Sequence, residues 1–373
     1  MKILEICPFS AGICGVWARV REESIRLSQR GYEMMVLSSN AVKGKDEIAC
    51  PEEKIGEVNI KRFPFKKIGG ESFMKWDFMN EAIEFNPDVI IAHCYRHIHT
   101  TRALKIAEKL RKTGKNCKVI LVTHAPFERK TTRTFAQNVI VWFYDNFIGR
   151  ATINKFDKIV AISRWEIPYL LKIGAQEKRI AYVPNGIPEE FFSTNQTAKS
   201  ENKMLFLGRI SPIKNIETAI KAIPLLKNKK IYLEIVGPAE EDYLNKLKEI
   251  IKELGVGKRA VFSQPIYNLE DKIKKIDSAK IFILPSKTEG MPQGLIEAMA
   301  RERIVIASDI PATRDLIKDG KTGLLFEVGN EKEFAKKIEI ALKDKKMGKA
   351  AKKSVEIFRW DKIIEKIEKL IKS

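Results

Sequence analysis

Short β-branched runs alternate along this chain with longer stretches whose apolar residues recur at helical spacing, and the alternation occurs twice. Such a pattern is typical of a parallel sheet with helices on both faces, because each crossover between parallel strands needs a helix-length segment. A polar stretch at residues 193–203 separates the two series. The expected strands are 2–7, 34–38, 88–93, 118–124, 158–163 and 180–184 in the first series and 204–207, 231–236, 260–263, 280–285 and 304–308 in the second.

The chain has 373 residues, which is too long for one ordinary core. We therefore predict an α/β protein with two doubly wound, Rossmann-like domains, the first over residues 1–190 and the second over residues 191–357. Residues 358–373 are expected to form a C-terminal helix whose apolar stripe packs back on the N-terminal domain. The other expected helices include 16–29, 101–112, 216–226, 241–254, 269–276 and 294–301.

The composition excludes several classes of protein. Hydrophobic residues make up 44% of the chain and charged residues 31%, which excludes a disordered protein. No apolar run approaches the roughly 18–20 residues of a spanning helix, and Glu5 interrupts the first run, so we expect a strand there and not a signal peptide. Five cysteines without a Cys-x-x-Cys spacing favour buried, reduced thiols in a cytosolic protein over structural zinc.

The charge balance is strongly basic, with 68 lysines and arginines against 48 acids and a formal net charge of +20. This excess predicts acidic partners (nucleic acid, anionic lipid or phosphorylated small molecules) unless it is only a solvated lysine-rich surface. Nucleic acid is disfavoured, because the chain contains no recognition module and its basic residues are spread along its length.

Residues 285–300 combine a strand end, a loop with Glu289 and a helix start near Gln293 that carries Glu297 in its first turns. Free backbone N–H groups at such a helix start form a cradle for a diphosphate. A carboxylate on each side would bind hydroxyls at the two ends of one ligand, a sugar and a ribose. The alternative is that both acids are solvated, since acids favour helix N-termini in general.

The loop after the expected strand 204–207 carries Arg209 and Lys214. Two cations five residues apart can converge on one phosphate, arginine as a planar fork and lysine as a point charge. An ordinary basic turn is the alternative.

The loop after the first strand contains Gly12 and Gly15, and glycine lets backbone approach a ligand closely. The loop lacks the Gly-x-Gly-x-x-Gly pattern, and residues 38–40 after the second strand include no acid. Both facts argue against a nicotinamide dinucleotide site.

His124 stands at the carboxyl end of an expected strand, where ligands of α/β folds bind; a structural histidine is the alternative. We interpret His93 as a second residue of the cleft, and His97 and His99 as surface residues. No histidine pair with an acid at metal spacing occurs, nor any Asp-x-Asp, so no metal ligand is predicted.

Together these features resemble one family over nearly the whole chain. The sequence is similar to the retaining glycosyltransferases of family 4, which have the GT-B fold of two Rossmann-like domains facing across a cleft. The residues that carry the resemblance are Gly15 and Val16, 30–33, His124, 161–163, 183–186, Gly208, Arg209, Lys214, the pair Glu289 and Glu297, and the Asp-Gly-x-x-Gly at 319–323.

The resemblance implies transfer of a hexosyl group from a UDP- or GDP-linked sugar to a glycan or lipid-linked glycan, with retention of configuration and no further cofactor. Arg209 and Lys214 would hold the donor diphosphate and offset the charge of the leaving group. Glu297 would take the ribose hydroxyls and Glu289 those of the transferred sugar. His124 would sit near that sugar and the acceptor, and no catalytic nucleophile is implied. Further donor contacts would come from Gly15, Ile266, Gly290, Met291, Pro292, Gln293, Gly294 and Leu295.

The chain departs from the family pattern at three places. Cys14-Gly15 replaces Gly-Gly, Gly31-Tyr32 replaces Gly-His, and residues 301–303 replace the small residues that usually follow Ala-Met-Ala. The first two departures concern the N-terminal, acceptor side, and none touches the implied donor core.

The acceptor side leaves alternatives open. Residues 127–156 mix basic and apolar side chains at helical spacing, which fits a helix packed in the domain core or a basic amphipathic helix that lies on anionic lipid at the inner face of the membrane. Rival functions are a sugar-nucleotide epimerase and a non-catalytic sugar-nucleotide-binding protein of similar fold. The residues concerned are Arg129, Lys130, Arg133, Phe135, Val139, Trp142, Phe143, Phe147 and Ile148.

Overall fold

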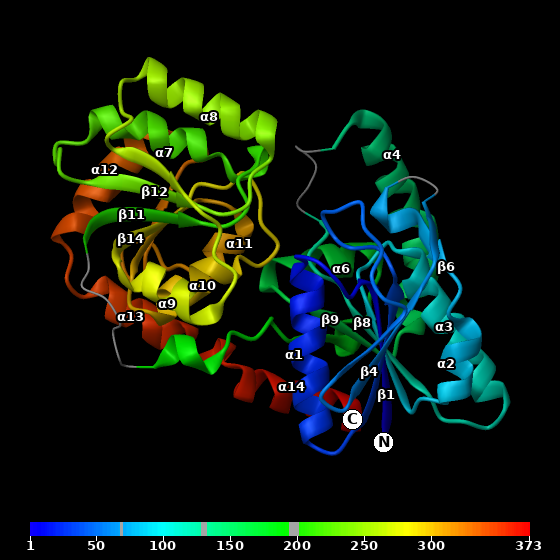
Figure 1. The fold of residues 1–373 in the computed structure, drawn as a ribbon. Helices are drawn as coiled ribbons and strands as arrows, with labels where there is room; N and C mark the ends of the chain where they lie inside the picture. Colours follow the sequence, from blue (N-terminus) through cyan, green and yellow to red (C-terminus); the bar gives the residue numbers. More distant parts are fainter. Residues whose placement is uncertain (68–69, 128–132, 194–200) are drawn as a thin grey trace. The chain divides into compact units, whose positions relative to one another are not determined.

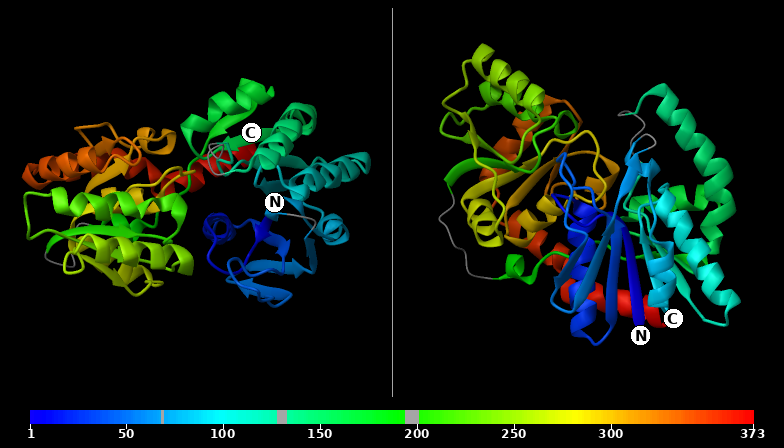
Figure 2. Two further views of the ribbon diagram at one scale, coloured as in Figure 1. Left: turned by 90° about the horizontal axis from the view of Figure 1, so that it is seen from above. Right: turned by 45° about the vertical axis from the view of Figure 1, so that its right-hand side comes forward.

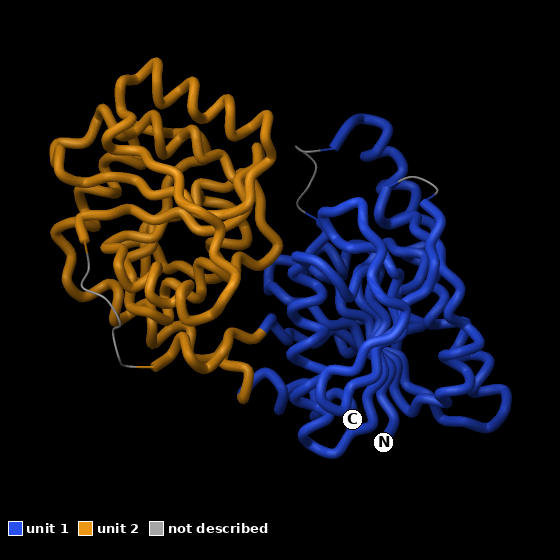
Figure 3. The backbone as a smooth tube through the Cα atoms, viewed as in Figure 1, with its two compact units in different colours: residues 1–185, 362–373 blue, residues 186–361 orange. Residues whose placement is uncertain are grey.

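The computed structural model describes residues 1–67, 70–127, 133–193 and 201–373. By its internal contacts the chain divides into two units, shown in Figure 3. Unit 1 comprises Met1–Asn185 together with Lys362–Ser373, and unit 2 comprises Gly186–Asp361. Each unit contains one large sheet, and the predicted class of two doubly wound α/β domains is confirmed.

The sheet of unit 1 is parallel except at one edge, where β3 runs antiparallel to β4. Helix α1 (Gly15–Gln29) covers one face, and α2 (Met79–Phe85) and α3 (Ile98–Lys112) cover the other (Figures 1 and 2). The strand order is β10 (Ile180–Tyr182), β9 (Lys158–Ala161), β8 (Lys118–Val122), β7 (Val89–His93), β1 (Lys2–Phe9), β2 (Glu33–Ser39), β4 (Val58–Phe63) and β3 (Glu52–Ile55).

Unit 2 has a fully parallel sheet with helices α7 (Ile216–Ala222), α8 (Glu241–Glu253) and α12 (Glu331–Lys343) on one face (Figure 1). Helices α9 (Leu269–Asp277), α10 (Gln293–Ala300) and α13 (Met347–Val355) lie on the other. The strand order is β13 (Ala260–Ser263), β12 (Tyr232–Val236), β11 (Glu201–Leu207), β14 (Ala279–Leu284), β15 (Ile304–Ser308) and β16 (Leu324–Phe326). Strand β11 therefore lies between β12 and β14, and the direction of winding changes beside it.

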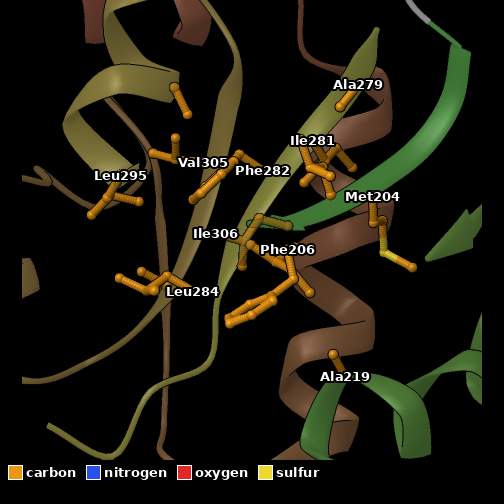
Figure 4. Packing of buried hydrophobic residues seen from close by; sticks show 14 of the residues in the cluster. Met204, Phe206, Ala219, Ala279, Ile281, Phe282, Leu284, Leu295, Val305 and Ile306 are labelled. Carbon is orange, nitrogen blue, oxygen red and sulfur yellow. The ribbon is translucent and has the colours of Figure 1, made fainter. Parts of the chain in front are cut away.

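The core of unit 2 is built around strands whose residues are apolar on both faces of the sheet. In β14 five of six residues are buried, and Phe282 pairs in register with Leu205 of β11 and with Val305 of β15. Figure 4 shows Phe206, Phe282 and Leu295 packed among aliphatic side chains of these strands and of α10. Parallel strands covered on both faces need such continuous apolar runs.

Helix α14 (Trp360–Lys372) ends the chain, and its residues from 362 onward belong to unit 1. The isoleucines of its apolar stripe are buried, and Lys118 of β8 donates a hydrogen bond of 2.9 Å to the carbonyl oxygen of Ile371. The Tyr32 hydroxyl donates one of 3.0 Å to Glu368. The buried residues of the stripe are Ile363, Ile364, Ile367 and Ile371.

Several expectations require correction. The strands expected at 118–124, 158–163 and 180–184 end earlier, at Val122, Ala161 and Tyr182. His124 adopts a left-handed conformation, Ser163 caps the helical turn that follows, and Pro184 has no N–H to pair with a neighbouring strand. Strands β3 and β4 were missed, since β3 reads Glu-Glu-Lys-Ile and is almost wholly exposed at the edge. All five cysteines are free, but Cys50 is exposed and Cys14 half-buried, so the expectation of buried thiols is wrong for both.

Candidate functional site

Two loops of unit 2 flank the point where its sheet changes winding direction. Residues 208–215 connect β11 to α7, and residues 285–292 connect β14 to α10. The N–H of Lys287 donates a hydrogen bond of 2.8 Å to the carbonyl oxygen of Ile213, which joins the two loops. Open α/β sheets bind ligands at the carboxyl ends of the strands beside such a switch point, so these loops form the candidate site.

The loops bring Lys214 and Glu289 into contact, although they lie 75 residues apart in the chain. The Lys214 ammonium is 2.6 Å from Glu289 Oε1, and the Ser286 hydroxyl donates to the same oxygen at 2.7 Å. Their side chains are 18% and 12% exposed. The sequence predicted separate roles for Lys214 and Glu289. In the structure the two side chains form an ion pair, so one ligand would contact both.

Glu297 lies in α10 and is buried, with both carboxylate oxygens next to the Lys272 ammonium of α9, at 2.7 and 2.6 Å. Sequence reasoning missed Lys272, because nothing distinguishes it from the other lysines on the polar side of an amphipathic helix. The Glu297 carboxylate, whose charge is balanced by Lys272, therefore lies near the start of α10. Pro292, which precedes that helix, provides no side-chain cap for its first N–H groups.

The remaining residues predicted for donor binding lie around the same loops. Arg209 is exposed, and no ion pair of its guanidinium occurs among the residues that the structure describes. The backbone of Gly237 (φ +147°) packs directly against the loop that carries Arg209. A side chain at position 237 would clash with that loop, because its Cβ would lie 2.0 Å from the carbonyl oxygen of Gly208. Ile266 is half-buried and packs against the core of unit 2. Gly290, Met291, Gln293 and Gly294 are half-buried, and Pro292 and Leu295 are buried.

The other two predicted site residues belong to unit 1. Gly15 is the first residue of α1 and is exposed, and a Cβ there would meet no described atom within 4 Å. His124 follows β8, half-buried, with its Nε2 2.9 Å from Nδ1 of His93 at the end of β7. Burial lowers the pKa of the His124 imidazole well below its usual value.

The backbone around His124 is strained and held by Glu166. His124 and Ala125 both adopt left-handed conformations, with φ of 58° and 51°. Such conformations cost on the order of 1–3 kcal/mol each in residues other than glycine, and they cluster at functional sites. The buried Glu166 carboxylate accepts a hydrogen bond from the Thr123 hydroxyl and others of 2.8, 2.8 and 2.9 Å from the N–H groups of Ala125, Ile162 and Ser163. Sequence reasoning did not single out Glu166.

The interpretation of His99 as a surface residue is wrong. Its side chain is buried, its Nε2 lies 2.6 Å from the carbonyl oxygen of His93, and its ring packs on Trp76 with centroids 4.9 Å apart. The N-terminal turn of α3 carries it inward beneath β6 (Met74–Trp76), one of the short strands that the sequence pattern did not reveal.

The comparisons with known proteins bear on both units. Residues 188–357 match the family model for glycosyl transferases group 1, and residues 13–191 match the model for glycosyltransferase family 4. The chain belongs to these glycosyltransferases. An uncharacterized glycosyltransferase of Methanocaldococcus jannaschii is 26% identical to it, with 96% of this chain and 94% of the relative covered.

Two more proteins similar to this chain are informative, one for the substrate in its name and one for its fold and bound ligand. An N-acetyl-D-galactosaminyltransferase of Campylobacter jejuni, named for an undecaprenol-linked substrate, is 32% identical over 48% of this chain and 50% of its own. HepE of Anabaena in complex with UDP-glucose superposes with a TM-score of 0.74 at 16% identity, covering 100% of this chain and 99% of HepE. This glycosyltransferase thus has the GT-B fold that the resemblance implied.

The described part of this glycosyltransferase contains no group of three or more His, Cys, Asp or Glu side chains arranged to hold a metal ion. The candidate ligand-binding features of its unit 2 are the paired Lys214 and Glu289, the paired Lys272 and Glu297, and the start of α10, which has no side-chain cap.

Proposed function

We propose that this glycosyltransferase moves a hexosyl group from a UDP- or GDP-linked sugar to a glycan or lipid-linked glycan, with retention of anomeric configuration. The observation that carries the proposal is the Lys214–Glu289 pair at the switch point of the sheet in unit 2. The pair offers an ammonium group that can bind a diphosphate and a carboxylate that can bind sugar hydroxyls, and the two groups are hydrogen-bonded to each other. The UDP-glucose bound to HepE and the lipid-linked substrate of the C. jejuni relative support the choice of substrates.

The chemistry proposed for these residues is electrostatic. Lys214, the exposed Arg209 and the first N–H groups of α10 would bind the donor diphosphate and stabilise the negative charge that grows on the departing nucleotide. The Glu297 carboxylate, held by Lys272, would accept hydrogen bonds from the ribose hydroxyls. Glu289 would orient the transferred sugar. In a retaining transfer the acceptor would attack from the face that the nucleotide leaves, so no protein nucleophile is assigned.

A sugar-nucleotide epimerase and a non-catalytic sugar-nucleotide-binding protein are the rival readings of the same residues. A transferase releases nucleoside diphosphate only when an acceptor is glycosylated. An epimerase would convert the donor without an acceptor, and a binding protein would do neither.

A thermal-shift titration of the purified protein with UDP, GDP, ADP and CMP tests the donor site. A nucleotide that binds only the folded protein at 100 times its Kd should stabilise it by about 2.7 kcal/mol. We expect a selective shift with UDP or GDP that the Glu297→Ala variant greatly reduces. Glu302→Ala, at a half-buried acid just beyond α10, is the matched control and should keep the shift. No shift with any nucleotide would refute the proposed donor class.

Residues 135–148 place large apolar side chains on the surface of unit 1. Helix α4 (Phe135–Phe143) has no buried residue and continues into the π-helix at Tyr144–Gly149. Two hydrogen bonds of 2.8 and 2.6 Å from Arg96 to Asp145 anchor the segment to unit 1. We define the α4 patch as Phe135, Val139, Ile140, Trp142, Phe143, Phe147 and Ile148, which are between 41% and 85% exposed.

The expectation that this helix packs in the core is therefore wrong for α4. We propose that the α4 patch contacts an anionic bilayer at the inner face of the cell membrane and brings the enzyme to a lipid-linked acceptor. Phenylalanine and tryptophan favour the membrane interface, and the exposed Arg150 and Lys155, which follow the patch in the chain, would meet anionic headgroups. Arg129 and Lys130, which were expected to add to this charge, lie outside the described residues. No helix in the described ranges is long and apolar enough to cross a membrane.

Liposome flotation tests the α4 patch. We expect the protein to float with vesicles that contain anionic lipid, and a Trp142→Glu and Phe147→Glu double variant to lose at least nine-tenths of that binding. Ile340→Glu is the matched control, because Ile340 is 51% exposed on α12 and lies in the other unit. Equal flotation of both variants, or no flotation of the native protein at any ionic strength, would contradict the proposal.

A further inference from the structure

A buried chain of three side chains leads from the middle of β1 to the loop that carries His124. Glu5 Oε2 is hydrogen-bonded to Nε2 of His93, and Nδ1 of His93 lies 2.9 Å from Nε2 of His124. Glu5 and His93 are fully buried. Because each ring nitrogen is either a donor or an acceptor, the protonation state of Glu5 decides the direction of both hydrogen bonds.

Two arrangements are compatible with this chain. If Glu5 is protonated, its O–H donates to His93 Nε2, His93 Nδ1–H donates to His124 Nε2, and His124 carries its own proton on Nδ1. If Glu5 is ionised, both hydrogen bonds reverse, the His124 proton moves to Nε2, and His124 Nδ1 becomes an acceptor. One proton on Glu5 therefore determines whether His124 presents a donor or a base.

The charges around Glu5 favour the protonated form. Arg19 is the buried guanidinium beside it, and its Nε lies 3.0 Å from Glu23 Oε2. A single cation can neutralise one carboxylate, and the one in direct contact with it is Glu23. Glu5 Oε1, in contrast, is buried without a hydrogen-bond partner among the described residues, which is costly for an ionised oxygen.

The titration of the cluster agrees with this assignment. Burial raises the pKa of the Glu5 carboxyl to about 8 and that of Glu23 to about 7, so Glu5 keeps its proton longer. Burial also lowers the pKa of His93 to about 3, which keeps its ring neutral.

Four other titratable groups face the chain. Cys7 of β1 lies near Glu5, Cys94 after β7 lies near Cys7, and burial holds the pKa of the Cys7 thiol well above its usual value. His97 and His99 of the α3 terminus are the other two, and burial keeps the pKa of His99 well below its usual value. Cys7 and His99 are therefore neutral at pH 7.

We propose that Glu5 and His93 are positioning residues that hold His124 in its Nδ1–H form, so that His124 donates a hydrogen bond to an oxygen of the sugar substrate and does not act as a base. Its role toward a sugar rests on the function proposed above. The tautomer itself rests only on the buried chain. A donating His124 suits a retaining transfer to which the protein contributes no nucleophile.

Long-range ¹H–¹⁵N correlation spectra of the histidine rings test the tautomer without any turnover. The chain has four histidines, so the signals can be assigned by single replacements. At pH 7 we expect His124 to be protonated at Nδ1 and bare at Nε2, and to change to the opposite form as the pH rises through about 8. His99 is the internal control, since its Nε2–H donates to the His93 carbonyl oxygen and should not change. A His124 protonated at Nε2 at pH 7 would overturn the proposal.

Two isosteric variants should have opposite effects on the pH at which the tautomer changes: Glu5→Gln should abolish the change, and Glu23→Gln should move it below pH 7. In Glu5→Gln the amide N–H still donates to His93, so His124 should stay protonated at Nδ1 up to pH 9.5, and any alkaline loss of transfer near pH 8 should disappear. In Glu23→Gln the Arg19 charge is left for Glu5, so His124 should carry its proton on Nε2 already at pH 7, with kcat/KM about tenfold lower, as for one lost hydrogen bond.

The two proposals fail in different ways. The expected tautomer in a protein that transfers no sugar would refute the proposed function and leave the positioning chain intact. Transfer activity with unchanged pH profiles and unchanged ring spectra in both variants would refute the positioning chain alone. Thermal unfolding of each variant separates these outcomes from a folding defect.

Discussion

Replacing Lys214 with methionine should lower kcat/KM for sugar transfer by about 10²–10³-fold, the loss typical when one preorganised group that stabilises developing negative charge is removed. Methionine keeps the length of the side chain but has no charge for the diphosphate. The change also leaves Glu289, only 12% exposed, with Ser286 as its remaining hydrogen-bond donor among the contacts described above. Steady-state kinetics measures the effect, with a donor sugar linked to the nucleotide that the thermal-shift titration selects.

Lys287→Met is the matched control for this experiment. Lys287 lies in the other loop of the site and carries the same charge, but its side chain is exposed, so transfer should change less than threefold. Equal losses in the two variants would indicate a general effect of positive charge on the donor and would contradict the specific role of Lys214.

Replacing Arg301 with alanine should lower the free energy of unfolding by about 3–5 kcal/mol, the usual cost of leaving one partner of a buried ion pair without the other. Arg301 and Asp277 are 1% and 0% exposed, and the guanidinium makes two hydrogen bonds, of 2.8 and 2.6 Å, to the carboxylate. It also donates to the Ser193 carbonyl oxygen at 2.8 Å. Denaturant unfolding followed by circular dichroism measures the loss.

The surface pair of Arg314 and Asp309 is the control, because it has the same two-bond geometry but is 60% and 39% exposed. Arg314→Ala should cost at most about 1 kcal/mol. A joint Asp277→Leu and Arg301→Leu replacement should recover most of the stability lost in Arg301→Ala, since no unpaired charge then remains buried. A loss of less than 1 kcal/mol in Arg301→Ala would show that water reaches Asp277.

The strands that build the two cores could be predicted from their composition. The buried run at 304–308 occupies the predicted residues in the structure, because such an apolar stretch needs cover on both faces. The edge strand at 260–263 also occupies the predicted residues, although only Ala260 in it is buried. Strand β3 could not be found in this way. Its residues lie at an exposed edge, where pairing with β4 holds the strand and hydrophobicity contributes little.

Residue types at strand ends also indicated the candidate site, but its pairs could not be derived. Lys214 and Glu289 follow different strands, and only the adjacency of β11 and β14 brings them within 2.6 Å. The contacts of Glu5 could not be derived from the sequence either. In the sequence it appeared only as an acid that interrupts an apolar strand, while its partners come from β7 and α1.

The role of Arg301, which departs from the family pattern, is likewise explained only by its contacts in the structure. The buried Asp277 at the end of α9 accepts two hydrogen bonds from this arginine, which a small residue at position 301 could not donate. Arg303 adds bonds of 3.1 Å to the carbonyl oxygens of Asp277 and Ala279. The arginines that depart from the family pattern are thus held by buried hydrogen bonds within unit 2.

Unit 1 is assembled from two separate pieces of the chain, since residues 362–373 return to it after the whole of unit 2. Any chimera that joined residues 1–185 to a foreign partner would lack α14, and the surface of unit 1 that the buried isoleucines of this helix cover would be exposed. Exchange of this unit between relatives by recombination therefore requires two breakpoints, one near Asn185 and one near Asp361. An enzyme that acquired a new N-terminal unit through a single crossover would keep a C-terminal helix that had evolved to pack on a different surface.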